Sequence, residues 1–567
     1  MSDVSGSNDL EKGEKSAGNT VVLHGLEEGA PDGTVHRTIG TGLFVGAGGA
    51  LNQGGPGGIL LGYSIMGAVV YSMMVALGEM CTLYPVSGAF THYAARFVDP
   101  ALGFAMGWNY WYSYAITLPA EISAAAFVIQ YWSSVADLNV AIWISVFLVV
   151  ICSFNFLGVR AYGEAEFWLS IIKIVTIIGL LILGLIITCG GVPGSPAIGF
   201  RYWKRPGPFV QLNGIPGAGG RFLSFWYTFV QAAFVSFQSS PCFKFGQHTD
   251  IAMFRQSYLG TEIVALTAGE AANPRRNVPK AIRRVFYRIL VFYGQFCEGA
   301  LATDCILTSM ILQVFGVLMI GMLVSPTDPS LLHGSGAAKS PWVIAITNAG
   351  IKGLPSVINT VVLLSAFSAG NSDLYAASRT LYGLACDGKA PAIFRKCTKN
   401  GLPIYCLIVT AAFGLLAYMS VGSSAANVFN DLVNLSSITG LITWGTILIS
   451  YLRFYAGCKA QGIDRNEFPF VAPFQPWASY FGLFFNGFTV FLSGQWNATN
   501  FVIAYITIAI FFVFFVFWKF YKKTKFVSVS AMDFETGRRE LDEMSDNEAA
   551  KMEEPTTWYG KVWAAVM

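Results

Sequence analysis

Two ionisable side chains lie inside long apolar stretches of this sequence. Glu121 lies in LPAEISAA, two residues after Pro119, and Lys173 lies in FWLSIIKIVTIIG. A charge in the hydrocarbon core of a bilayer is costly unless it is paired or faces a water-filled path. Such groups can exchange a proton during a reaction cycle, so Lys173 and Glu121 are candidates for proton coupling. The alternatives are snorkelling of the lysine amine to the interface and a structural pairing of the glutamate with a neighbouring helix.

Glycines in two further apolar stretches could expose backbone groups to a ligand. A helix that breaks at glycine leaves free N–H groups, which bind a carboxylate well, although glycine also permits close helix packing. The first stretch consists of Thr38, Ile39, Gly40, Thr41 and Gly42. The second is Gly260-Thr261-Glu262. Glu262 is either a functional carboxylate beside a helix break or a structural one that bonds to neighbouring helices.

Weaker signals come from polar residues in other apolar stretches. Ser368, Asn371 and Ser372 lie in FSAGNSDLY, and Asn434 and Ser436 lie in a later stretch. They could line a transport pathway or merely link helices by hydrogen bonds. The sequence has no Walker loop, no HExxH or GxSxG motif and no CxxC pair among its ten cysteines. We therefore expect no catalytic residues, no metal site and no cofactor.

The elements that hold these residues are expected to be membrane helices. The chain has 567 residues, of which 54% are hydrophobic and 12% charged, whereas about a quarter of an ordinary soluble domain is charged. About 20 apolar helical residues cross a bilayer, and a helix satisfies its own backbone there. Twelve spans are expected, near residues 38–53, 59–78, 101–132, 141–158, 167–188, 222–238, 285–324, 355–378, 402–420, 427–451, 477–494 and 501–518.

The basic loops predict the orientation of the chain in the membrane. NPRRNVPKAIRR follows the sixth span, RTLYGLACDGKAPAIFRKCTKNG the eighth, and KFYKKTK the twelfth, all on one side. The long loop at 189–222 is a basic exception on the other side. Since cytoplasmic loops carry the excess of Lys and Arg, both termini are predicted to be cytoplasmic. The polar tails, 1–37 and 521–567, are expected to be disordered or loosely docked, and the net charge of +3 gives no case for nucleic acid.

These residues lie in longer stretches that resemble the fungal (yeast-type) amino acid permeases of the amino acid–polyamine–organocation superfamily. The stretches are TIGTGLFVGAGGAL, GEMCTLYPVSGAF, WNYWYSYAITLPAEISAAAFVIQYW, GEAEFWLSIIKIV, GTEIVALTAGEAANPRRNVPKAIRRVFYRIL and SAFSAGNSDLYAASRTLYGLA. They extend through most of residues 38–520. ITLPAEISAAAFVIQYW resembles the general or proline-type branch more than the branch for basic amino acids.

The resemblance implies an all-α polytopic membrane protein of about twelve transmembrane helices. Two inverted five-helix repeats, with helices one and six broken, would be followed by two C-terminal helices. The implied function is import of amino acids, neutral with a broad range or proline, by proton symport through alternating access. The implied location is the plasma membrane.

Roles for individual residues follow from the same resemblance. The substrate carboxylate would meet the amides of Gly40–Gly42, and its amino group the carbonyls near Leu259 and Gly260. Lys173 matches a lysine that replaces a sodium ion in relatives. The remaining implied site residues are Thr261 in the pocket, Phe234 or Tyr258 as its gate, and Glu262 as a tuning or proton-relay group.

Three segments depart from the family pattern. The basic segment and the apolar residues that precede TIGTG in family members are missing, so the first helix looks shortened. Residues 235–256 and 294–313 interrupt the sixth and seventh spans with charged residues that lipid would reject. We interpret both as translated introns and the short first helix as a misplaced exon boundary. The alternative is that they are loops that the fold tolerates.

Two other classes of function compete with the transporter. A transport-inactive amino acid sensor could use the same fold, and long cytoplasmic tails would favour it. A membrane-embedded enzyme would need a reactive dyad facing a cavity. The five histidines lie in tails, loops or a suspected insert, so they offer no such dyad. We therefore do not expect an enzyme.

Overall fold

The computed structural model consists of helices joined by loops, with no strand among the residues that it describes. These are residues 47–84, 89–132, 138–157, 159–192, 196–234, 315–333, 340–398, 401–421, 425–468, 470–492 and 498–536. Both suspected inserts, most of the seventh predicted span and the start of the first lie outside them. The described parts of the other predicted spans coincide with helices.

Helix α2 (Ala47–Leu83) joins the end of the first predicted span to the second across a sharp bend. Gly55 has φ 72°, and Pro56 follows it. Thr228 of α9 (Gly217–Phe234) donates a hydrogen bond to Gly58 O (2.8 Å). Because Gly62 has no side chain, α2 and α9 approach so closely that a Cβ there would lie 2.8 Å from the backbone nitrogen of Phe229. Small residues thus hold these two helices together.

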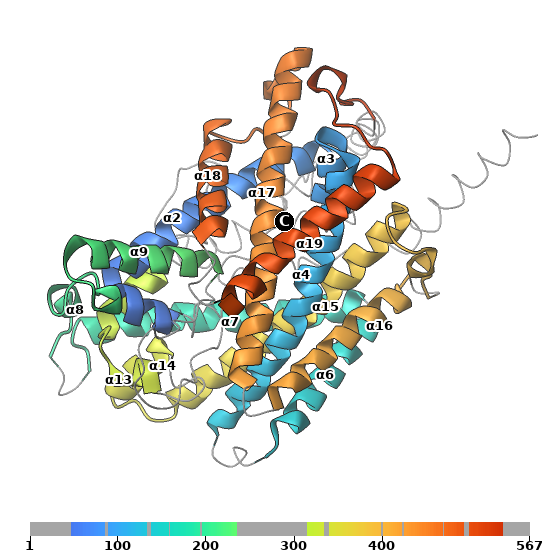
Figure 1. Cartoon of the computed structure of the whole chain (residues 1–567). Helices are drawn as coiled ribbons and strands as arrows, with labels where there is room; N and C mark the ends of the chain where they lie inside the picture. Colours follow the sequence, from blue (N-terminus) through green and yellow to red (C-terminus); the bar gives the residue numbers. More distant parts are fainter. Residues whose placement is uncertain are drawn as a thin grey trace, which may run out of the picture.

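Helix α4 (Pro100–Val128) lies at the centre of the bundle. It packs against α15 (Leu354–Cys386), α17 (Ala425–Gln461) and α19 (Ala498–Tyr521), as Figure 1 shows. Asn109 of α4 donates to the carbonyl of Thr439 in α17 (2.9 Å). The remaining helices are α3 (Ala89–Phe97), α6 (Val140–Phe156), α7 (Val159–Thr188), α8 (Arg201–Lys204), α13 (Pro329–His333), α14 (Pro341–Asn348), α16 (Ile404–Phe413) and α18 (Trp477–Leu492). Short 3-10 turns, among them η8 (Gly414–Val421) and η9 (Arg465–Glu467), connect or extend several of them.

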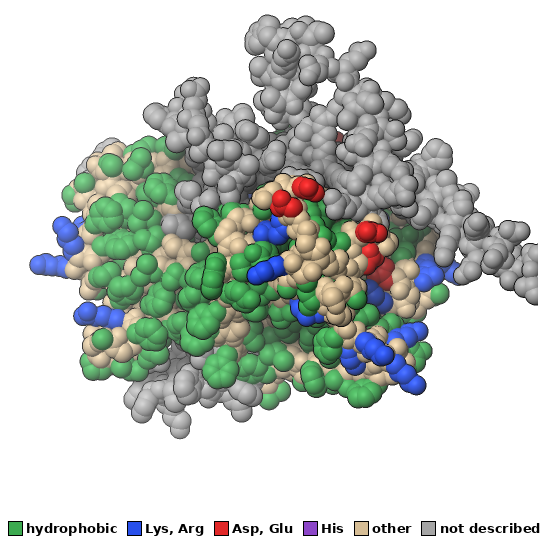
Figure 2. All heavy atoms as spheres, turned by 90° about the horizontal axis from the view of Figure 1, so that it is seen from above, with side chains coloured by type: hydrophobic (Ala, Val, Ile, Leu, Met, Phe, Trp, Pro, Cys, Tyr) green, Lys and Arg blue, Asp and Glu red, His purple; other side chains and the backbone are tan. Residues whose placement is uncertain are grey.

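Five helices in the described part of the chain are long and apolar enough to cross a membrane. They are Ala47–Leu83, Pro100–Tyr131, Glu164–Thr188, Leu354–Cys386 and Ile404–Val421, and Val140–Phe156 and Tyr505–Tyr521 are shorter apolar helices. Large apolar side chains such as Phe484, Val513 and Trp168 are more than 60% exposed. Hydrophobic side chains also cover much of the face in Figure 2. Such a surface suits lipid, and it agrees with the predicted multi-pass membrane protein.

Several helices extend beyond their predicted spans, among them α7 and α17. Helix α7 begins at Val159 rather than near residue 167, and α17 continues to Gln461 rather than ending near 451. In both cases the additional turns carry charged or polar residues, such as Glu164 and Lys459. Hydropathy marks the lipid-embedded part of a helix, and therefore misses turns that continue into water.

The beginning of the C-terminal tail packs against the helices. Phe534 is buried against Phe97 of α3 and Phe454 of α17, with ring centroids 5.9 and 5.7 Å away. Arg96 of α3 donates to the carbonyls of Asp533 (2.8 Å) and Thr536 (2.9 Å). We call residues 522–536 the C-terminal strap. It lies beside α3 and one end of α17 in Figure 1.

Candidate functional site

Lys173 lies in a buried polar cluster between α7 and α15. Its side chain is 4% exposed, and its Nζ donates to Ser368 Oγ (2.9 Å). Ser368 Oγ in turn donates to Glu166 Oε2 (2.6 Å). The hydroxyl of Ser368 therefore lies between an amine and a carboxylate, so these two groups of α7 are connected by hydrogen bonds through a residue of α15.

The carboxylate of Glu166 is held at both oxygens. Asn371 of α15 donates to Glu166 Oε1 (3.0 Å), while Ser368 occupies Oε2. Asn155 of α6 donates to the side-chain oxygen of Asn371 (2.7 Å), which fixes the orientation of that amide. All of these side chains are buried. Polar residues from three helices thus form one connected network in an otherwise apolar interface, where such bonds are strong.

The pattern of helical spacing explains how the network assembles. Glu166 and Lys173 are seven residues, about two turns, apart on α7 and so share one face. Ser368 and Asn371 are three residues apart on α15 and likewise share a face. Each helix therefore contributes a pair of polar groups to the same contact. Sequence reasoning found Lys173, Ser368 and Asn371 but missed Glu166 and Asn155.

Glu121 of α4 is buried close to this network. Glu121 packs against Gly370 of α15, where an added Cβ would be 3.6 Å from Glu121 Cβ and 3.0 Å from Ile151 of α6. The absence of a side chain at Gly370 lets α4, α6 and α15 meet at one level. Glu121 therefore approaches α15 within one turn of Ser368 and Asn371.

The predicted substrate-binding residues lie outside the described residues, with one exception. Those outside are Thr38, Ile39, Gly40, Thr41, Gly42, Tyr258, Leu259, Gly260 and Thr261, together with the proposed relay residue Glu262. Phe234 is the last residue of α9, and only its backbone is described. The helix breaks and the gate accordingly stay predictions. Of the weaker candidates, Ser372 accepts a hydrogen bond from Tyr162 (3.2 Å) and the carbonyl of Ser436 accepts one from Ser113 (3.4 Å).

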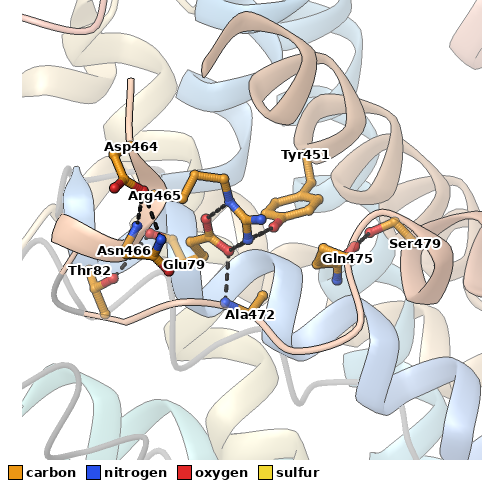
Figure 3. A network of polar contacts seen from close by, with 9 residues as sticks. All are labelled: Glu79, Thr82, Tyr451, Asp464, Arg465, Asn466, Ala472, Gln475 and Ser479. Atoms are coloured by element: carbon orange, nitrogen blue, oxygen red, sulfur yellow. Dashed lines mark hydrogen bonds and ion pairs between the residues drawn. The ribbon is translucent and has the colours of Figure 1, made fainter. Parts of the chain in front are cut away.

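A second buried carboxylate, Glu79, organises one end of the bundle and was not predicted. Its side chain is fully buried at the end of α2. Arg465 donates to both of its oxygens at 2.7 Å, and Tyr451 OH and the backbone nitrogen of Ala472 also donate to Oε2, at 2.7 and 2.8 Å. Figure 3 shows these donors converging on the carboxylate from α17 and the loop that follows it. This arrangement ties α2 to α17.

The electrostatics of the Glu79 network are those of a tight ion pair. Partial burial by itself would lower the pKa of Arg465, but the hydrogen bonds and the negative charge of Glu79 outweigh it and raise that pKa. The guanidinium also lies over the ring of Tyr455, 4.8 Å from its centroid. Arg465 therefore stays charged at any physiological pH.

Comparison with known proteins adds to this geometry. The amino acid permease family model matches residues 34–240 and 250–531. The interruption at 241–249 falls inside the first suspected insert. Among solved structures, a manganese transporter from Eremococcus coleocola aligns with 92% of this chain and 97% of its own, at a TM-score of 0.47 and 11% identity.

Curated relatives match over nearly the whole chain. A dicarboxylic amino acid permease from Saccharomyces cerevisiae is 41% identical over 91% of this chain and 80% of its own length. A proline-specific permease from Emericella nidulans is 38% identical over 93% and 90%. A general amino-acid permease from Saccharomyces cerevisiae is 38% identical over 93% and 82%. The predicted resemblance is confirmed, and the chain belongs to the amino acid permease family.

Proposed function

We propose that this permease imports amino acids by proton symport through alternating access. The observation that supports proton coupling is the environment of Lys173, a buried amine that is linked by hydrogen bonds through one hydroxyl to a buried carboxylate. Replacing a buried ion pair with apolar residues often leaves stability unchanged or increases it, so stability alone does not explain a buried charge here. Charged groups inside membrane helices typically serve ion pathways and proton relays. The basic loops support cytoplasmic termini, and the plasma membrane is the proposed location.

We propose neutral amino acids, with a broad range or with a preference for proline, as the substrates. The stretch ITLPAEISAAAFVIQYW supports this, as do the relatives named as a proline-specific permease and a general amino-acid permease. The dicarboxylic permease is 41% identical to this chain, compared with 38% for each of those two relatives. Acidic amino acids therefore belong in the test as the competing substrate class.

The substrate would bind where helices one and six break. Free amides at Gly40 and Gly42 suit a carboxylate, and free carbonyls near Leu259 and Gly260 suit an ammonium group. Thr261 would line the same pocket, with Phe234 or Tyr258 closing it. Glu262 and Glu121 are the further carboxylates proposed to tune the site or to relay protons.

Uptake of labelled amino acids by permease-deficient cells tests this proposal. The full chain is expected to accumulate proline and alanine at acidic external pH, and aspartate and lysine much less. Lys173→Ala is expected to abolish uptake driven by the pH gradient, while Lys352→Ala, at an exposed lysine, leaves it intact. Proton-driven uptake that survives in Lys173→Ala would remove Lys173 from the mechanism.

The alternative is a transport-inactive sensor on the same fold, and the interrupted sixth span favours it. Residues 235–256 separate α9 from the predicted break at Gly260, and the family match stops at 241–249. Uptake by the full chain is therefore compared with uptake by a chain lacking 235–256 and 294–313. Transport only after deletion would support the retained introns, and transcript sequencing across the junctions would show whether the mature message contains them.

A further inference from the structure

The hydroxyl of Ser368 joins two charged groups that the helix backbone keeps two turns apart. Lys173 Nζ donates to Ser368 Oγ, and Ser368 Oγ donates to Glu166 Oε2. This donor order is the one expected for a protonated amine and an ionised carboxylate. A hydroxyl can also rotate and reverse the order, with a neutral carboxylic acid donating to it and the hydroxyl donating to a neutral amine. Both protonation states therefore fit the same heavy-atom positions.

We propose that Glu166 is the second proton-carrying group of the transport cycle and that Ser368 conducts the proton of Lys173 to it. This inference rests on the proton symport proposed above. In the transfer, an N–H bond of Lys173 breaks as its proton binds Ser368 Oγ, and the original hydroxyl proton binds Glu166 Oε2. The products are a neutral amine, an intact hydroxyl and a neutral carboxylic acid. The total charge of the buried cluster is unchanged, so no uncompensated charge is left in the membrane.

The network leads from Glu166 towards the end of the bundle that carries the basic loops. A small hollow opens there, with room for about one water molecule, and it is lined by Asn155, Tyr162, Tyr375, Ser378 and Arg379 together with two leucines. Asn155 both lines the hollow and donates to Asn371, which donates to Glu166. Glu166 is therefore two hydrogen bonds from this hollow, whereas Lys173 is one polar group further away. The amides of Asn155 and Asn371 orient the carboxylate and carry no proton themselves, so the acceptor that we assign to the proton of Glu166 is water that enters from the hollow.

Other ionisable groups lie on the elements next to this path and must be distinguished from Glu166. On the described elements that pack against α7 they are Asp373, Tyr375, Arg379, Tyr382 and Cys386 of α15 and Cys152 of α6. Glu121 of α4 approaches the same part of α15 at Gly370. The groups whose titration could be mistaken for that of Glu166 are the carboxylates Asp373 and Glu121.

Transport by the purified full chain in liposomes separates a proton role from a structural one. Counterflow exchange of labelled substrate needs no net proton transfer, whereas accumulation under a pH gradient does. In Glu166→Gln, accumulation is expected to fall about 100-fold, the scale of a lost proton-transfer group, while exchange falls much less. Glu166→Asp should restore part of the accumulation with a shifted pH profile. The matched control is Glu164→Gln, an exposed glutamate two residues earlier on α7.

The hydroxyl is tested with a smaller change, in case Glu166→Gln does not fold. Ser368→Ala should lose accumulation and Ser368→Thr should retain it. Ser365→Ala is the control, because Ser365 is a buried hydroxyl one turn away that has no hydrogen-bond partner among the described residues. Equal losses of exchange and accumulation in Glu166→Gln and Ser368→Ala would mean a structural role and overturn the proposal.

A readout that does not need transport distinguishes this inference from the proposed function. Infrared difference spectra of the full chain between acidic and neutral pH should contain a carboxylic-acid band that Glu166→Gln removes and that Asp373→Asn and Glu121→Gln keep. If the wild type never accumulates substrate under a pH gradient, the proposed function fails, while the band still decides whether Glu166 titrates. An unchanged spectrum in Glu166→Gln would overturn the assignment of Glu166.

Discussion

Replacing Arg465 should destabilise the permease strongly, because it strands the buried carboxylate of Glu79. Arg465 provides two of the four donors to that carboxylate, each at 2.7 Å, and Glu79 has no exposed surface. Arg465→Met leaves only Tyr451 OH and the backbone N–H of Ala472. Removing one partner of a buried ion pair costs about 3–5 kcal/mol, and we expect a loss of that size.

Two further variants check where this energy comes from. Arg465→Lys keeps the charge, but a lysine ammonium cannot reproduce the two parallel hydrogen bonds that the guanidinium donates to the carboxylate. It should therefore cost about 1.5–3 kcal/mol, the value of one hydrogen bond to a charged group. In the double variant Glu79→Gln/Arg465→Met no charge is stranded, so it should be more stable than Arg465→Met alone. Lys459→Met, at an exposed cation in the last turn of α17, is the control and should change stability by less than about 0.5 kcal/mol.

The assay is the free energy of unfolding of the detergent-purified chain, from a reversible denaturant titration followed by tryptophan fluorescence. Arg465→Met is expected to lower the transition midpoint clearly, and the double variant to recover part of it. If Arg465→Met unfolded at the same midpoint as Lys459→Met, the four-donor network would contribute nothing to stability and the reasoning would be wrong.

Three further predictions concern packing and pH. Burial lowers the pKa of His92 in α3. As the pH is lowered through the ordinary pKa of histidine, the unfolded chain therefore binds more protons than the folded one, and the stability decreases by at most about 1.4 kcal/mol per pH unit. His92→Gln should flatten that dependence between pH 7.5 and 5.5, and an unaltered slope would contradict this. Phe534→Ala removes a buried ring worth about 3 kcal/mol or more, so trypsin should cleave the C-terminal strap at Lys525 at least tenfold faster; an unchanged rate would mean that the strap is not held by Phe534. Gly62→Ala forces α2 from α9 and should cost about 1–3 kcal/mol in a melting experiment, whereas Gly49→Ala, where a Cβ would have nothing within 4 Å, should be nearly neutral.

The sequence predicted the helices well because hydropathy reports directly on the solvent around each segment. It predicted the positions of α4, α6, α15 and α19 within a few residues of their spans, although α15 extends to Cys386. It could not predict which helices pair, because packing depends on shape. The closeness of α2 to α9, for example, depends on what faces Gly62 in space.

The candidate site was predicted in part, for a similar reason. Lys173 was visible because apolar residues surround it in the sequence. Glu166 was overlooked because it stands near the beginning of its span, where a carboxylate is unremarkable. Its separation of seven residues from Lys173 was the available signal, since that spacing puts both on one face of a helix. Glu79 could not be found in this way, because Arg465 and Tyr451 are hundreds of residues away.

The C-terminal strap shows where composition misleads. The tail was expected to be disordered or loosely docked because it is polar and mixed in charge. Its described beginning is held by two buried apolar residues, Met532 and Phe534, and by backbone carbonyls that accept from Arg96 and Gln461. Two well-placed anchors suffice to dock a segment whose average composition is polar.

The central claim is that substrate and proton cross the membrane together, and the most direct measurement is proton movement itself. Liposomes containing the purified full chain and a pH-sensitive dye in the lumen would receive proline without an imposed gradient. Proton symport predicts that the lumen acidifies when proline is added to the wild type and not when it is added to Lys173→Ala. Labelled proline that enters the liposomes while the lumen pH stays constant would contradict the account.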